Sequence, residues 1–151
     1  MNTAKPLLIT LATAGLAFAA TAPASAAEQT KTAMADPAAH DTLHSGAWTK
    51  KSFKSAGTWE VYADGDALYV KLSADFRTRN APDLKIFLSP LTASATTGKN
   101  ATDGAVLIAP LTSNSGEQVY EIPAGVDLAD FKSILIHCEQ YSKLWSAADL
   151  A

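Results

Sequence analysis

Hydrophobic and polar residues alternate in short runs from about residue 58 onward, a pattern typical of strands with one buried face. The clearest runs, Thr58–Ala63 and Leu68–Leu72, flank the turn tripeptide Asp64-Gly65-Asp66 and therefore predict a β-hairpin. No run sustains a helical period, so we expect an all-β domain, an antiparallel β-sandwich or barrel-like fold of about 7–8 short strands. The other predicted strands are Leu84–Leu88, Ala105–Ala109, Gln118–Ile122, Ser133–Cys138 and Leu144–Ala147.

The segments between these runs carry turn-forming residues. Val126–Phe131 is predicted to form one helical turn. Thr92–Asp103 is small and polar, and we expect it to be an exposed loop with few contacts. The sharpest turns are expected at Asn80-Ala81-Pro82-Asp83, Asn114-Ser115-Gly116 and Pro123-Ala124-Gly125.

The first 26 residues are typical of an export signal. Lys5 precedes an uncharged apolar run over Pro6–Ala20, and Ala24-Ser25-Ala26 is a small-x-small cleavage pattern. The apolar run is shorter than the roughly 20 residues that cross a bilayer, so no membrane span is expected after cleavage. We therefore predict a periplasmic or secreted protein.

The next segment, residues 27–47, is rich in Ala, Thr, Asp and His and is predicted to be a flexible N-terminal arm. Asp36-Pro37 can begin a short helix that runs toward His44, since Asp is a good N-cap and Pro suits the first helical position. Aromatic and aliphatic residues become frequent from Trp48, so the β domain is expected to cover residues 48–151.

Composition adds limits on function. The 151 residues are 48% hydrophobic, with 12 basic and 15 acidic side chains and a formal charge of −3. This length and apolar content are typical of one folded domain. Acidic side chains outnumber basic ones, so the protein is not expected to attract nucleic acid. The sequence has no G-x-S-x-G, no H-E-x-x-H, no glycine-rich phosphate loop and no C-x-x-C-H, so we do not expect an enzyme.

The single cysteine, Cys138, cannot form a disulfide within its own chain. Alternation places it with Ile134 and Ile136 on one face of a strand, and His137 on the opposite face. Cys138 is therefore a packed small hydrophobe, a thiol paired with another chain, a redox-active thiol, or a ligand to a metal or haem. His137 and Lys143 are the residues that could lower its pKa if the thiol acts bare.

Other candidate sites have weaker support. His40 and His44 are four residues apart, which would place both imidazoles on one helix face as a metal site requires, although a solvated helical turn is the favoured interpretation. Asp64-Gly65-Asp66 lacks the further acidic positions of a calcium loop and is interpreted as a turn. Trp48, Trp59 and Trp145 could stack on sugars, but tryptophans in small β domains more often belong to the core.

Five ordered motifs resemble those of the DM-thirteen domain family, a small extracellular module often found beside DOMON domains. They are Ala74-Asp75-Phe76, Asn80–Ser89, Gly116–Pro123, Ile134–Tyr141 and Ala147–Leu150. The chain departs from the family pattern at Ala81, where glycine is usual, and at His137, where an aromatic residue, often Trp, precedes the cysteine.

This resemblance implies a β-sandwich-like electron-transfer domain in which Cys138 serves redox chemistry, either as a bare thiol or by holding a prosthetic group such as haem. A redox partner protein or a cell-surface component would then be its partner. The alternative is an extracellular binding or adhesion module in which Cys138 is structural. In that case Trp48, Trp59 and the loop Thr92–Asp103 would be the surface to examine.

Overall fold

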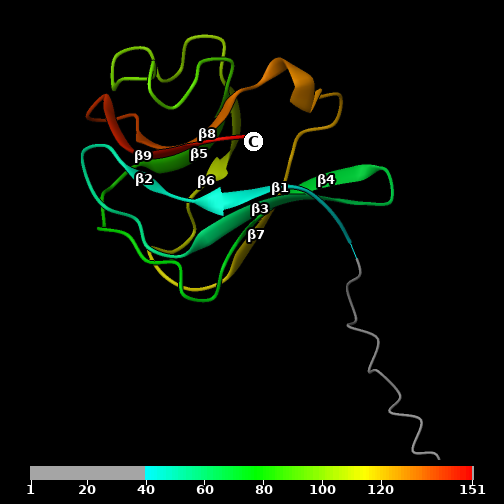
Figure 1. Ribbon diagram of the computed structural model, residues 1–151. Coiled ribbons are helices and arrows are strands. Elements are labelled where there is room, and N and C mark those ends of the chain that lie inside the picture. The colour runs from blue at the N-terminus through cyan, green and yellow to red at the C-terminus, as the bar shows by residue number, and fades with distance from the viewer. Residues whose placement is uncertain (1–39, 151) are drawn as a thin grey trace, which may run out of the picture. The chain divides into compact units, whose positions relative to one another are not determined.

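The computed structural model describes residues 40–150, which form two antiparallel sheets packed into a sandwich (Figure 1). One sheet has four strands in the order β1-β3-β4-β7, and the other has five in the order β2-β9-β8-β5-β6. The fold class predicted from the alternation is therefore confirmed, and it is a sandwich. The strands are β1 Asp41–Ala47, β2 Thr49–Lys50, β3 Thr58–Asp64, β4 Ala67–Leu72, β5 Leu84–Ser89, β6 Val106–Pro110, β7 Gln118–Glu121, β8 Ser133–Cys138 and β9 Lys143–Asp149.

The predicted hairpin is present as β3 and β4. Asp64 pairs with Ala67, and the two residues between them form the turn, with Gly65 at φ +61°. A positive φ is accessible to glycine without steric cost, which explains why the turn tripeptide carries glycine at this position. The seven strands predicted from the sequence are all found, and the expected helical turn is a short 3₁₀ helix, η1 Leu128–Asp130.

A β-bulge interrupts the pairing of β8 with β9. Ile136 pairs with Ser146 but His137 pairs with Leu144, so Trp145 is an extra residue on β9. As a consequence Trp145 joins the core between the sheets, while the adjacent Leu144 belongs to a cluster on the outer face of the five-stranded sheet.

The core between the sheets is built from alternate residues of both sheets, as expected for a sandwich. Trp59 and Val61 of β3 face Ile134 and Ile136 of β8 in one contiguous cluster. The three tryptophans all belong to this core, with exposed fractions of 8% for Trp48, 1% for Trp59 and 4% for Trp145. They therefore do not form the sugar-stacking surface considered from the sequence.

The loop Thr92–Asp103 is not the contact-poor segment that its composition predicts. Ala93 and Ala101 are buried in a second apolar cluster with Phe87 and Leu135 of the five-stranded sheet. Its small side chains allow the loop to lie close against the outer face of this sheet, above β9 and β5 in Figure 1. Small residues here indicate close packing, not mobility.

The N-terminal boundary of the folded domain also differs from the prediction. Asp41–Ala47, assigned to a flexible arm, forms β1, which pairs with β3 from Asp41 to Ala47 with a register shift between Thr42 and His44. Gly46 explains part of this pairing, because a side chain there would come within 3.1 Å of the Trp59 ring. The predicted signal peptide at residues 1–26 and the start of the arm lie outside the described residues. Within residues 40–150, no helix is long and apolar enough to cross a membrane.

Candidate functional site

Cys138 is the last residue of β8, and its side chain has no exposed surface. It belongs to the core cluster between the sheets, together with Leu84 and Trp145. Its neighbours across the two ladders are Leu84 of β5 and Lys143 of β9. The sulfur is thus surrounded by the core, but the exposed turn of residues 139–142 begins at the next residue.

His137 lies on the opposite face of β8, as alternation predicts. It is 3% exposed, and its Nε2 donates to the carbonyl oxygen of Gly98 at 3.1 Å. Its Nδ1 is buried without a hydrogen-bond partner, and its ring meets Phe87 edge-on. Since His137 and Cys138 face different layers, they do not combine in one site in this structure.

Gly98 is a residue of this region that sequence reasoning missed. A Cβ at this position would lie 2.2 Å from the carbonyl oxygen of Ser142, so only glycine fits between the loop and the β8–β9 turn. Through the Gly98 carbonyl the loop also holds His137. The only sequence signal is a glycine in an alanine- and threonine-rich loop, which does not specify this contact.

The turn after Cys138 is fixed by charged groups from the start of β5. The Nζ of Lys85 forms ion pairs with Glu139 and, at 3.2 Å, with Asp83. The backbone N–H groups of Glu139 and Gln140 donate to the carbonyl and carboxylate oxygens of Asp83, respectively. The hydrogen bond to Glu139 is the main cause of a raised pKa of Lys85. These groups, Asp83, Lys85 and Glu139, are called the turn clamp below.

A haem does not fit at Cys138 in this structure. The side chain has no exposed surface, and Cys138 lines neither the groove beside Trp59 nor the pockets beside Pro82 and Pro123. An iron ligand needs an open position beside the sulfur and an apolar cavity for the porphyrin. The side chains around Cys138 offer neither.

An aromatic pair connects this part of the core to the surface. The rings of Trp145 and Phe53 lie 4.1 Å apart between centroids, and Trp145 Nε1 donates to the carbonyl oxygen of Arg79. The guanidinium of Arg79 lies 5.1 Å from the centre of the Phe53 ring, and Lys143 Nζ lies 5.8 Å from it. Phe53 is half-buried, so one side of the pair reaches solvent beneath two cations.

A hydroxyl network fixes the segment that carries Phe53. Ser55 Oγ lies 2.9 Å from Thr78 Oγ1 and 2.7 Å from Ser146 Oγ, and Ser146 donates to the Phe53 carbonyl. All three hydroxyl-bearing residues are buried. The position of Phe53 over Trp145 is therefore determined by the core and not by the exposed lysines beside it.

His40 and His44 are not brought together as a metal site. The helix expected here does not form, because Asp41–Ala47 pairs with β3, and along an extended chain residues four apart are on the order of 13 Å apart. His40 instead lies 3.0 Å from a carboxylate oxygen of Glu60 and stacks on Tyr62. Among residues 40–150 no three His, Cys, Asp or Glu side chains are grouped so as to hold a metal ion.

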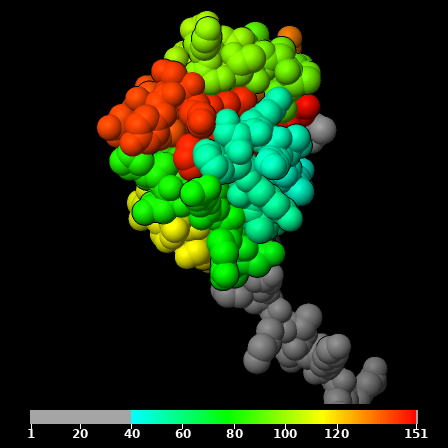
Figure 2. All heavy atoms as spheres, turned by 90° about the vertical axis from the view of Figure 1, so that its left-hand side faces the viewer, coloured from blue at the N-terminus to red at the C-terminus, as the bar shows by residue number. Residues whose placement is uncertain are grey.

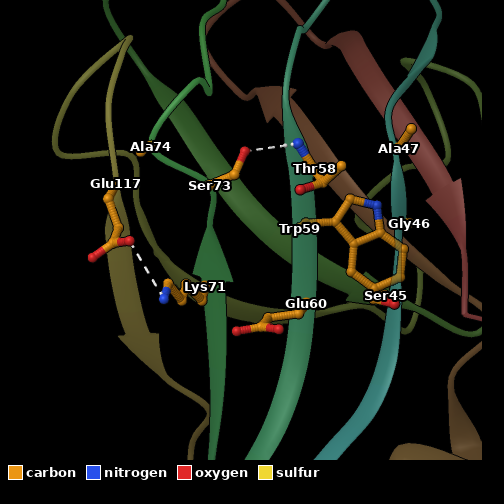
Figure 3. Close-up of a pocket in the computed structure, with 10 residues that line it drawn as sticks. All are labelled: Ser45, Gly46, Ala47, Thr58, Trp59, Glu60, Lys71, Ser73, Ala74 and Glu117. Carbon is orange, nitrogen blue, oxygen red and sulfur yellow. Dashed lines mark hydrogen bonds and ion pairs between the residues drawn. The ribbon is translucent and has the colours of Figure 1, made fainter. Parts of the chain in front are cut away.

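A separate groove of about 540 Å³ lies on the four-stranded sheet (Figure 3). Glu60, Lys71 and Glu117 come from three strands or their flanking turns and lie along one side of it, with Lys71 paired to Glu117 at 3.4 Å. The indole of Trp59 lies between β3 and Gly46 of β1. The groove does not approach Cys138 along the chain or across the ladders.

Two stacked antiparallel sheets with one cysteine at the end of a central strand define a small β-sandwich domain of the kind expected from the motifs. The family model described as Electron transfer DM13 matches residues 48–150, and the chain therefore belongs to the DM13 family of electron-transfer domains. This family is not a catalytic one in the usual sense. No match was found among curated proteins or among solved structures.

Proposed function

We propose that this protein is an exported electron-transfer domain whose redox group is the thiol of Cys138. The observation that carries the proposal is the position of the only cysteine, at the last residue of a central strand and directly before an exposed turn. Membership of the DM13 family supports the electron-transfer role. The signal-like sequence of residues 1–26 supports a periplasmic or secreted location, where a redox partner protein or cell-surface component would be met.

In this proposal the turn of residues 139–142 controls access to the sulfur. The turn is exposed, and Ser142 has a φ of 46°, which is unfavourable for a residue with a Cβ. Local opening of such a turn requires less free energy than unfolding of the sheet. The sulfur would become accessible when the turn clamp releases, without loss of the core.

The test is the reaction of the folded protein with glutathione disulfide, followed by mass spectrometry. The thiolate of Cys138 attacks one sulfur of the disulfide, a mixed disulfide forms, and one glutathione thiolate leaves. We expect the addition of one glutathione, reversed by dithiothreitol, at a rate well above that of global unfolding. Cys138→Ser should not react.

The contrary result is modification only at the rate of global unfolding, measured independently by denaturant jump. Cys138 would then be a core residue that the folded protein does not expose. A visible spectrum of protein expressed with haem present tests whether Cys138 binds haem. A Soret band that disappears in Cys138→Ala would contradict the exclusion of haem made above.

The second candidate is a binding or adhesion module in which Cys138 only packs. It is favoured by one specific observation, the absence of any exposed surface on Cys138. The tryptophans are buried, so the surfaces to examine would be the groove beside Glu60 and Lys71 and the exposed side of the Thr92–Asp103 loop. Cys138→Ala would leave such a binding activity intact, whereas it removes the proposed redox activity.

A further inference from the structure

The cations of the described chain are unevenly distributed. Among the lysines and arginines of residues 40–150, only Lys71 and Lys85 form ion pairs with carboxylates. The remaining ones include a group around the ring of Phe53, although acidic residues outnumber basic ones in the chain. Like charges that gather in one place repel each other, and none of these has a carboxylate partner.

We name this group the basic patch and define it as Lys51, Phe53, Lys54, Arg79 and Lys143. Arg79 and Lys143 both lie over the Phe53 ring, and Lys51 and Lys54 flank Phe53 in the chain. Lys54, Arg79 and Lys143 are exposed. Figure 2 shows this face, where the teal segment containing β2, the green segment after β4 and the orange-red β8–β9 hairpin meet.

The basic patch is connected to Cys138 through the ladder of β8 and β9. Lys143 is the direct partner of Cys138, which places their Cα atoms roughly 5 Å apart. Trp145 shares the core cluster with Cys138 and packs at a tilt against Phe53 of the patch. A partner bound here would thus lie against both the aromatic pair and the strand end that carries the thiol.

Several carboxylates lie on a different part of the molecule, whereas Asp83 and Glu139, at the turn beside the patch, are paired with Lys85. Glu60 of β3 and Glu121 of β7 lie on the outward positions of the four-stranded sheet, and Asp64 and Asp66 flank the tip of its hairpin. An acidic partner would therefore be attracted to the basic patch and repelled from this sheet. Such a charge distribution orients an encounter and raises its rate.

We infer that the basic patch is the docking surface for a carboxylate-rich face of another protein, and that this partner carries a disulfide that oxidises the thiol: the Cys138 thiolate attacks one disulfide sulfur, a mixed disulfide forms, and the partner's other sulfur leaves as a thiolate. The second part rests on the proposed function, whereas the first rests on the charges and the half-buried aromatic ring alone. Aromatic residues and arginine dominate the binding energy of protein interfaces, and a half-buried Phe53 beneath Arg79 supplies both.

A folded protein fits the patch better than a nucleic acid or an anionic membrane does. The patch has four cations, two of them over the Phe53 ring, which are too few to follow a nucleic-acid backbone, and the net charge of −3 repels one. A folded protein with a local acidic surface can contact the patch without approaching the carboxylates of the four-stranded sheet. The same reasoning disfavours an extended anionic membrane surface.

The experiment follows the amide resonances of the isotope-labelled protein during titration with poly-L-glutamate. We expect shifts confined to residues 51–54, Arg79 and Lys143, and affinity that falls when salt is raised, since surface charges are screened. Lys54→Glu and Lys143→Glu together should weaken binding about tenfold. Lys132→Glu is the matched control, because Lys132 is exposed, has no ion pair and lies outside the patch, and it should bind almost as the wild type does.

The inference is overturned if the shifts map elsewhere, if Lys132→Glu weakens binding as much as the patch variants, or if heparin or phosphatidylglycerol vesicles bind more tightly than poly-L-glutamate. Cys138→Ala should bind as the wild type does. None of these readouts depends on the sulfur, so a failure of the redox proposal leaves them unchanged. A failure of docking likewise leaves the glutathione reaction unchanged.

Discussion

The side chains of Cys138 and His137 leave one strand in opposite directions, and each meets a different chemical environment. The sulfur enters the apolar core between the sheets, whereas the imidazole lies under the Thr92–Asp103 loop and donates to Gly98. A thiol in such a core is stabilised as a small hydrophobe, and its weak polarity needs no partner. Because the site is buried, replacement of the thiol by a polar group lowers the free energy of unfolding.

Substitution of Cys138 tests this environment directly. Cys138→Ala should lower the free energy of unfolding by about 1–2 kcal/mol, because a buried heavy atom is removed and a small cavity remains. Cys138→Ser should lower the free energy of unfolding by about 1–3 kcal/mol more than Cys138→Ala does, because a buried hydroxyl would lack a hydrogen-bond partner. Urea unfolding with an unchanged m-value measures both. A serine variant as stable as the alanine variant would show that the site is polar or hydrated.

The strands show which elements can be predicted from sequence. Seven runs of strand-forming residues were enough to locate β3 to β9. Alternation is clear in β3, β4 and β7, whereas β8 is an apolar run buried on both faces. β1 escaped prediction because it is an edge strand, largely exposed, whose pairing depends on β3 and on the space that Gly46 leaves for Trp59. The Thr92–Asp103 loop was misjudged for a related reason, since alanine and threonine also suit close packing on a sheet.

The candidate site could be predicted only in part. Alternation separated Cys138 from His137 correctly, and the motifs identified the family. The turn clamp could not be predicted, because Lys85 and Glu139 are far apart in sequence and meet only through the pairing of β5 with β8. The place of Trp145 in the core depends on a bulge, which the residue pattern does not reveal.

The turn clamp should determine how often the β8–β9 turn opens. Lys85→Met removes the cation that holds Asp83 and Glu139, so Cys138 should react several-fold faster with glutathione disulfide in the folded state. Lys132→Met, which alters an exposed lysine without an ion pair, is the control and should leave the rate unchanged. An equal acceleration in both variants would exclude a specific role for the clamp.

The pH dependence of this effect has a defined direction. The pKa of Lys85 is raised, chiefly by its hydrogen bond to Glu139, so the folded state holds this proton more tightly than the unfolded state does. Its stabilising contribution is fully present below the ordinary lysine pKa of about 10.4 and is lost as pH rises through the higher folded-state pKa. The difference in stability between wild type and Lys85→Met should therefore persist from neutral pH to about pH 10 and then decline. A difference that disappears near pH 8 would contradict the assignment.

At the scale of the whole molecule, the folded unit extends beyond the family match. The match begins at residue 48, but β1 precedes it and completes the four-stranded sheet. Trp48 and Trp59 lie 6.3 Å apart between ring centroids, so the start of the matched region packs against a strand that β1 covers. The basic patch and the outward carboxylates of the four-stranded sheet lie on separate parts of the surface.

Removal of β1 tests this wider boundary. A chain that begins at Trp48 should lose on the order of 2 kcal/mol of stability, because Trp59 loses its cover at Gly46. Its tryptophan fluorescence should shift to the red as the indole meets water. A chain that begins at His40 keeps β1 and should match the full-length protein. If both truncated chains are equally stable, β1 is a dispensable addition.

The single residue Trp48 joins β1 of one sheet to β2 of the other. Under a mechanical load applied at the amino end, β1 would separate from β3 one residue pair at a time, since it lies at a sheet edge and its ladder is loaded from Asp41. The buried indole of Trp48 would then stop the peeling. Further extension would have to pull β2 from β9 and draw the tryptophan out of the core. The chain therefore resists tension in two stages, a weak one in its first strand and a stronger one at the crossing between the sheets.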